Sequence, residues 1–546
     1  MDLFRFLVER SRSSQRAIAW LIVISGLSSG LLLGVVNATA ERAVEGGIQF
    51  HLVLLFAVVL ALNTVTKRAA LKRASIAAEQ AIRDIRVKLS DRVRRSELQF
   101  IESIGRSEIY ARLTQDTSSV SQAMPIVFNG YQSAVVIFAG LAYMATISVE
   151  AFVFTVLSLG IGAWAFLNAH KRSLAEIIQA LAKETEFFDS LGHLLEGFKE
   201  IKLSRRKNEG VFRRISIVAE ETRHLIVGTV LRYVNHVVIL QLLIFCVIAL
   251  LIFVLPSLEY LDGQQVLKLT ATMLFMIGPI EITLYAWHAQ TKAKAALSGI
   301  VRLEAQLAAA GDNSVSAAVS DEKTDLWRNF QRIELSGVTF SYSDPAHPFR
   351  VGPVDLSIVR GETTFIVGGN GCGKSTLLKL LTGLYHPIGG HIAIDGQAIG
   401  PDEYQGYREL FSAIFADFHL FDELYDLDAV DADRVNELLR RMGLADKTEY
   451  RDGQFTTLDL STGQRKRLAL VAAILEDRPI YIFDEWAADQ DPEFRVQFYD
   501  AILPELRALG KTVIAVTHDD RYFARCDQLA KMDYGQIALI ERPSGG

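Results

Sequence analysis

Two polar, glycine-bearing stretches in the C-terminal half of the sequence could each bind an anion. The first, FIVGGNGCGKST, places Gly368-x-x-x-x-Gly373-Lys374-Ser375 directly after an apolar run. Glycines at this spacing let backbone N–H groups wrap phosphates, while the lysine reaches the β- and γ-phosphates and the serine binds Mg²⁺. The helix expected to follow adds its positive N-terminus. The second stretch, LSTGQRKRLAL at 460–470, raises the question of why one chain carries two such elements.

Acidic and basic residues follow two other apolar runs. In PIYIFDEW the apolar run is followed by Asp484 and Glu485. In TVIAVTHDD the apolar run is followed, after Thr517, by His518. One carboxylate can hold Mg²⁺, and the next can orient the attacking water and accept its proton. An isolated histidine is more often structural, but at the edge of a parallel sheet His518 can contact the γ-phosphate. We therefore predict Glu485, His518 and Lys374 as the catalytic residues.

Short β-like runs alternate with helical stretches through this half of the chain. They read RIELSGVTFSY, TTFIVGG, HIAIDG, IYIFDE and TVIAVTHD. Such alternation indicates an α/β domain with a nucleotide-binding sheet, which we place at 327–546. The small, polar residues 305–326 before it are interpreted as a linker.

The N-terminal half is apolar enough to cross a membrane. The chain is 50% hydrophobic with a mean hydropathy of +0.22, and a spanning helix needs about 20 apolar residues. A signal peptide is disfavoured for the first apolar run, which is too long for one. We predict a transmembrane domain over 1–304 with spans at about 17–39, 48–66, 122–147, 149–169, 235–257 and 266–288. The sixth span contains Glu281, which is either an intramembrane acid or, if that helix ends earlier, an acid in water.

Two long basic segments separate these spans, after the second and after the fourth. Because basic loops stay in the cytoplasm, the N-terminus, both segments and the C-terminal domain are predicted to be cytoplasmic, and the chain to lie in the cytoplasmic (inner) membrane. The segments have few helix breakers, so we favour helices that continue beyond the membrane over two soluble insertions.

Charge and cysteine content exclude some functions. The formal net charge is −6, which gives no indication of nucleic-acid binding. Cys246, Cys372 and Cys526 lie too far apart for a zinc site or a disulfide framework and are expected to be isolated thiols.

The phosphate loop, LSTGQ, FDEW and THDD, in this order, resemble the ATP-binding cassette (ABC) family. In that family the second stretch is a signature that binds the nucleotide of the opposite subunit. The resemblance therefore implies ATP and Mg²⁺ as cofactors and a homodimer with two shared ATP sites. It gives the fold class as a six-helix exporter-type transmembrane domain followed by a P-loop domain.

The resemblance also assigns roles to individual residues. In one copy it implies that ATP contacts Tyr342, Gly368, Asn370, Gly371, Cys372, Gly373, Lys374, Ser375 and Thr376, with Tyr342 stacked on adenine unless it is a core tyrosine. In the other copy it implies contacts from Ser461, Thr462, Gly463 and Gln464. Asp491 matches a dimer contact, and Ser375 and Asp484 match metal ligands. Ala416 stands where the family usually has a glutamine, so Asp417 is the nearest substitute ligand.

The membrane half and the segment DEWAADQDP extend the resemblance. ESIGRSEIYARLTQD and LLEGFKEIKL are similar to the cytoplasmic loops that press coupling helices onto the cassettes. Three cassette segments, LSTGQRKRLAL, FDEWAADQDPEFR and THDDRYF, together resemble the cyclic-peptide and peptide-siderophore exporter subfamily. This implies a small peptide or siderophore-like cargo and contact with membrane lipids, and it leaves an outer channel partner open. Glu281 is a candidate cavity residue. A lipid or multidrug exporter is the close alternative, and a membrane ATPase that senses a ligand without transport is the alternative from another class.

Overall fold

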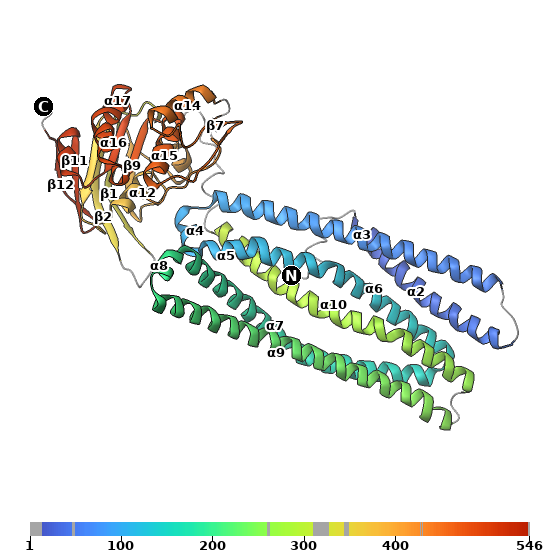
Figure 1. Cartoon of the computed structure of the whole chain (residues 1–546). Coiled ribbons are helices and arrows are strands. Elements are labelled where there is room, and N and C mark those ends of the chain that lie inside the picture. The colour runs from blue at the N-terminus through green and yellow to red at the C-terminus, as the bar shows by residue number, and fades with distance from the viewer. Residues whose placement is uncertain are drawn as a thin grey trace. The chain divides into compact units, whose positions relative to one another are not determined.

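The chain forms two units in a computed structural model that describes residues 14–45, 50–258, 262–309, 327–342, 349–425, 427 and 430–543 (Figure 1). One unit consists of Met1–Arg94 and Glu102–Ala309. The other consists of Arg95–Ile101 and Ala310–Gly546. Residues 305–309 of the expected linker are helical, and 310–326 lie outside the described residues.

The first unit is helical, and in its described part six helices are long and apolar enough to cross a membrane. The long helices are α2 (Ser14–Glu45), α3 (Phe50–Arg95), α6 (Thr117–Ile147), α7 (Val149–Glu196), α9 (Arg205–Ala249) and α10 (Gly263–Ala309). Short elements join them: α4 (Leu98–Ile104), α5 (Arg106–Ala111), the π-helices η1 (Arg112–Asp116) and η2 (Leu250–Val254), α8 (Phe198–Lys202) and η3 (Pro256–Leu258).

Four of these helices extend far beyond the length of a membrane span. The helices α3, α7, α9 and α10 have 46, 48, 45 and 47 residues. The expectation of continuous helices is confirmed, and that of soluble insertions is wrong. The helix α10 also runs unbroken through Glu281, so the alternative in which the sixth helix ends before this residue is wrong as well.

Small residues allow the membrane helices to approach closely. A Cβ atom on Gly130 of α6 would lie 2.1 Å from the Cβ of Ala286 on α10, and one on Gly30 of α2 would lie 2.5 Å from that of Ala139. Helices packed in lipid gain stability from such close backbone approach. A polar contact adds to it: Gln132 of α6 donates to Ser25 Oγ of α2 at 2.9 Å.

The second unit contains two main sheets. One has the order β12-β11-β3-β10-β9-β6, and the other has the order β2-β1-β4-β5. The strands are β1 (Arg332–Ser341), β2 (Arg350–Val359), β3 (Thr363–Gly368), β4 (Gly389–Ile394), β5 (Gln397–Ala398), β6 (Phe411–Ile414), β9 (Ile480–Asp484), β10 (Thr512–Val516), β11 (Gln528–Asp533) and β12 (Gln536–Glu541), and a small hairpin pairs β7 (Tyr450–Arg451) with β8 (Gln454–Phe455). Within the first sheet β11, β3, β10, β9 and β6 are parallel.

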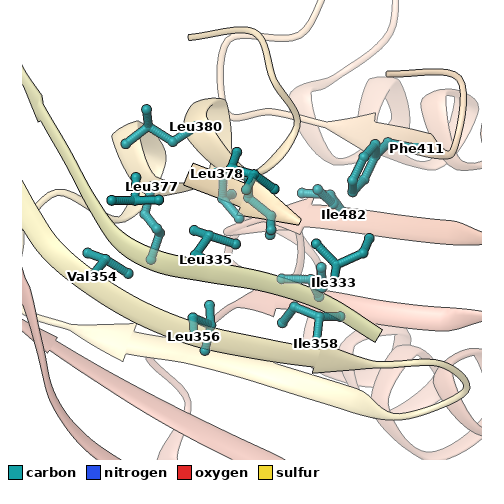
Figure 2. Packing of buried hydrophobic residues seen from close by; sticks show 14 of the residues in the cluster. Ile333, Leu335, Val354, Leu356, Ile358, Leu377, Leu378, Leu380, Phe411 and Ile482 are labelled. Atoms are coloured by element: carbon teal, nitrogen blue, oxygen red, sulfur yellow. The ribbon is translucent and has the colours of Figure 1, made fainter. Parts of the chain in front are cut away.

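Helices flank the parallel sheet. They are α12 (Lys374–Leu381), α13 (Tyr404–Arg408), α14 (Ala432–Arg441), α15 (Thr462–Glu476), α16 (Pro492–Gln497) and α17 (Leu503–Ala508). Figure 2 shows the core in which leucines of α12 meet the apolar faces of both sheets. Leu377, Leu378 and Leu380 are fully buried there, against strand residues such as Leu335 and Ile482. This packing fixes the position at which α12 begins, and its first residue is Lys374.

Candidate nucleotide site

The loop between β3 and α12 has a backbone that only glycine adopts readily. Gly368, Gly371 and Gly373 have φ values of 155°, 76° and 104°. A Cβ on Gly368 would lie 2.3 Å from the carbonyl oxygen of Met532, so a larger residue is excluded there. Asn370 is exposed on the loop and Cys372 is buried beneath it. The loop therefore has the open, N–H-rich form that cradles phosphate.

Lys374 is buried, and its ammonium folds back over the loop. Its Nζ donates to the carbonyl oxygens of Gly368 at 3.1 Å and Gly369 at 3.0 Å. The same Nζ lies 3.8 Å from Oε1 of Glu485. A cation at this position can reach a phosphate held by the loop.

The register of the parallel strands brings the other predicted residues to the same edge. Ile366 of β3 pairs with Val516 of β10, and Val516 pairs with Asp484 of β9. Glu485 and His518 follow these strand ends, and His518 Nε2 lies 2.9 Å from Glu485 Oε1. Glu485 has a φ of 50°, which is uncommon outside glycine, and its N–H donates to Val516. The geometry brings a carboxylate, an imidazole and an ammonium together.

Two oxygen donors for a metal ion lie beside this group. Ser375 Oγ donates to Asp484 Oδ2 at 2.9 Å. Burial raises the pKa of Asp484, and the neighbouring charge of Glu485 acts in the same direction, although the Ser375 hydroxyl opposes it. A hydroxyl and a carboxylate are ligands that suit Mg²⁺, so these residues fit that ion.

Ala416, which stands where the family usually has a glutamine, acts through its main chain. The main-chain amide of Ala416 acts on the Asp484 carboxylate and opposes the rise in its pKa. Asp417 is exposed, and among the described residues no hydrogen bond or ion pair joins it to Ser375 or Asp484. Its assignment as a metal ligand therefore stays a prediction.

Tyr342 lies next to the phosphate loop rather than inside the core. Its hydroxyl is 2.9 Å from Oγ1 of Thr376, and its ring packs edge-on against Phe340. The side chain is 37% exposed, which leaves a ring face available. This position is compatible with the predicted stacking on adenine.

The signature segment begins the helix α15. Ser461 is its N-cap: its Oγ accepts from the N–H of Gln464, and Gln464 Oε1 accepts from the N–H of Ser461. A Cβ on Gly463 would lie only 2.7 Å from the carbonyl oxygen of Asp489. Ser461 and Thr462 are exposed, and among the described residues no hydrogen bond joins them to the phosphate loop of the same chain.

Comparison with known proteins decides what this arrangement is. The sequence profile described as ABC transporter matches residues 351–488. The ATP-binding protein SyrD of Pseudomonas syringae pv. syringae is 31% identical over 545 residues, which cover 96% of this chain and 94% of SyrD. The chain belongs to the ABC transporter family.

Two further similarities extend this result. The probable syringafactin export ATP-binding/permease protein SyfD of Pseudomonas syringae pv. syringae (strain B728a) is 31% identical over 223 residues, 38% of this chain and 33% of SyfD. A solved bacterial Atm1-family ABC exporter with ATP bound has a TM-score of 0.79 at 17% identity, covering 97% of this chain and 96% of that one. This ABC transporter thus combines an ATP-binding domain with a multi-pass membrane unit, in the fold of an ABC exporter.

Lys466 is a residue of the transporter's nucleotide site that sequence reasoning missed. It is 3% exposed, and its Nζ donates to the main-chain oxygen of Glu485 at 2.8 Å and pairs with Asp489 at 2.7 Å. Trp486 Nε1 in turn donates to the carbonyl oxygen of Lys466 at 2.9 Å. These bonds hold the turn that contains Glu485 against α15, the helix that begins with the signature. In the sequence Lys466 is the middle one of three consecutive basic residues, so nothing distinguished it from Arg465 and Arg467.

Asp491 has partners within its own chain. It caps α16 by accepting from the N–H of Phe494 at 2.9 Å, and it pairs with Arg467 of α15. The hydrogen bond from Phe494 and the neighbouring guanidinium lower the pKa of Asp491, so it is ionised at neutral pH. Its side chain remains 53% exposed, so it is available for the predicted contact with a second copy.

Glu97 is a second residue that sequence reasoning missed. It lies in the segment Arg95–Ile101, which belongs to the nucleotide-binding unit. Its Oε2 is 2.6 Å from Arg408 Nη2 and 3.3 Å from His386 Nε2, and Leu98 packs on the apolar core. Burial alone would raise the pKa of Glu97, but His386 and Arg408 outweigh it and lower that pKa. Nothing in the sequence distinguished Glu97 from other acidic residues, because exposed acids are common in helical loops.

Proposed function

We propose that this ABC exporter moves a small cyclic or otherwise modified peptide, or a peptide siderophore precursor, out across the cytoplasmic membrane. The observation that carries the proposal is the similarity to SyrD over both units, membrane helices included. Support for a peptide comes from SyfD, whose name assigns it syringafactin export, although that match covers only 38% of this chain.

We further propose that the working form is a homodimer with two shared ATP sites. Support comes from the signature end of α15, where Ser461 is exposed and has no bond to its own phosphate loop in the described residues. An exposed helix N-terminus favours a negative charge, so it suits a γ-phosphate held by a second copy. A closed dimer that makes these extra contacts binds ATP better than an open one, and this difference can drive the membrane half outward.

The residues at the strand ends would divide the work of hydrolysis. Glu485 accepts the proton of the attacking water, His518 holds the Glu485 carboxylate in place, and Lys374 balances phosphate charge. When bound, Mg²⁺ neutralises charge on the β- and γ-phosphates, and Ser375 and Asp484 would hold it. The basic segments next to the spans support a cytoplasmic position for the nucleotide-binding unit.

The cargo can be found by comparing cells that carry the wild-type protein with cells that carry Glu485→Gln. Untargeted mass spectrometry should find a small modified peptide in the medium of the first and retained inside the second. Inverted membrane vesicles should then accumulate that peptide only with ATP. Accumulation of lipids or unrelated drugs instead, or peptide-stimulated ATP hydrolysis without any accumulation, would contradict the proposal.

A further inference from the structure

The helices α6, α7, α9 and α10 surround a cavity of about 400 Å³, which is within the size range of small-molecule pockets. Its walls are almost entirely hydrocarbon and aromatic, with residues such as Ile137, Leu240 and Ile280. Phe166 packs edge-on against both His236, at 5.6 Å between ring centres, and Trp287, at 6.4 Å. The cavity therefore suits an apolar chain.

One polar atom in this cavity has no partner. Nε2 of His236 is buried and makes no hydrogen bond to any residue that the structure describes. By contrast, the Thr283 hydroxyl, which also lines the cavity, is satisfied by the carbonyl oxygen of Pro279 at 2.8 Å. A buried polar atom without a partner is costly, so His236 offers a hydrogen bond to a ligand in an otherwise apolar space.

An acidic residue, Glu281, directly follows the cavity residue Ile280 on α10. Gln241 donates to Oε1 of Glu281, and the residues that precede these two, Leu240 and Ile280, line the cavity. The amide satisfies a lone pair of Glu281 but leaves its charge, and in the described part of the chain no lysine or arginine pairs with it. An acid in a membrane span is expensive without a counter-charge, which indicates a functional site.

Aromatic rings continue from Glu281 along the same helix face. Glu281, Tyr285 and His288 follow one another at helical spacing on α10. Tyr233 of α9 lies 6.2 Å from the ring of Tyr285 and 5.0 Å from that of His288. Tyrosine faces attract cations, so this surface adds to the attraction of Glu281 for positive charge.

We propose that the cavity and this acidic aromatic surface together bind a cationic amphiphile. Its hydrocarbon tail occupies the cavity, and its ammonium or guanidinium group lies beside Glu281 and the tyrosines. The inference rests on the proposed function, because it narrows the cargo of the same exporter to acylated or otherwise strongly apolar peptides that carry a positive charge.

Binding can be measured with defined probes on the full-length protein in nanodiscs of zwitterionic lipid. The main probe is N-dodecanoyl-lysine amide with a bromine at the end of its tail, which quenches tryptophan at short range. Three comparison probes carry a neutral norleucine head, an acidic glutamate head, or an acetyl group in place of the tail. We expect the main probe to bind at least tenfold more tightly than each of the others, with a saturable quench that disappears in Trp287→Phe.

Matched variants separate the two parts of the site. A Cβ on Gly162 would lie 3.2 Å from Leu240 Cδ1 at the cavity wall, whereas one on Gly160 would meet nothing within 4 Å. Gly162→Leu should therefore weaken binding at least tenfold, and Gly160→Leu should not. Glu281→Gln should keep binding of the neutral probe and abolish the preference for lysine over norleucine.

Several results would overturn the inference. They are equal binding to Gly162→Leu and Gly160→Leu, a lysine preference that survives Glu281→Gln, tighter binding of the glutamate probe, or quenching unchanged in Trp287→Phe. If Gly162→Leu fails to fold, which a loss of basal ATP hydrolysis would reveal, Glu281→Gln and Trp287→Phe still test the inference. ATP-dependent peptide uptake with no binding of the main probe would refute only this inference, whereas tight probe binding with no peptide export would refute only the proposed function.

Discussion

His518 Nε2 lies 2.9 Å from Oε1 of Glu485, and Lys374 Nζ lies 3.8 Å from the same oxygen. The carboxylate that is predicted to activate water is thus held between two basic groups from two other segments of the chain. Strand register produces this arrangement, because β3, β10 and β9 are parallel neighbours that end at one edge of the sheet.

Glu485→Gln should bind ATP as the wild type does and lose ATP turnover by about 100-fold or more, since a positioned general base contributes on the order of 10²–10⁴. The measurement is phosphate release together with nucleotide binding on the purified protein. Glu493→Gln changes an exposed acid on the next helix and should hydrolyse ATP normally. Normal turnover in Glu485→Gln would remove Glu485 from its assigned role.

Lys466→Met should reduce ATP turnover roughly tenfold with little change in ATP affinity. The substitution removes the bond to the carbonyl oxygen of Glu485, which helps hold that residue at a φ of 50°. Arg465→Met alters the exposed neighbour on α15 and serves as the control. If both variants hydrolyse ATP at the same rate, Lys466 does not position Glu485.

Gly463→Ala should lose most ATP hydrolysis, whereas Thr462→Ala should retain it. The added Cβ at Gly463 would lie 2.7 Å from the main-chain oxygen of Asp489, so α15 or the turn after β9 would have to move. Thr462 is exposed, and its backbone N–H is unaffected by the substitution. Steady-state ATPase assays on both variants test this, and equal activity would contradict it.

Trp486→Ala should destabilise the protein by about 3–5 kcal/mol, the range for large aromatic residues removed from a core. Trp486 is 1% exposed and stacks on Phe498 at 4.5 Å between ring centres. Trp486→Phe keeps an aromatic ring but loses part of the buried volume and the bond to Lys466, so its cost should be smaller than that of alanine. Thermal unfolding of the reconstituted protein measures both, and an alanine variant as stable as wild type would refute this.

Glu97→Gln should lower the amount of cargo moved per ATP hydrolysed, with basal ATP turnover changed less than twofold. The carboxylate joins α4 to Arg408 and His386, while the nucleotide residues are untouched. Parallel transport and ATPase assays give the ratio. The charge swap Glu97→Arg with Arg408→Glu should recover part of it, and a swap no better than either single variant would argue against a role for this ion pair.

The sequence by itself determined the elements and their chemistry. Six apolar stretches long enough to span a membrane, and the order of phosphate loop, signature, acidic strand end and histidine, are local patterns. They depend on hydrophobicity and on residue types at short spacing, which a linear chain displays directly. The expectation that α3, α7, α9 and α10 continue beyond the spans also came from the local absence of helix breakers.

The tertiary structure decided which distant residues act together. No spacing in the chain could show that Lys466 reaches the carbonyl oxygen of Glu485, or that Glu97 pairs with Arg408. These contacts depend on strand register and helix packing, which long-range burial sets. The same holds for Glu281: its helix could be anticipated, but its bond to Gln241 follows only from how α9 packs against α10.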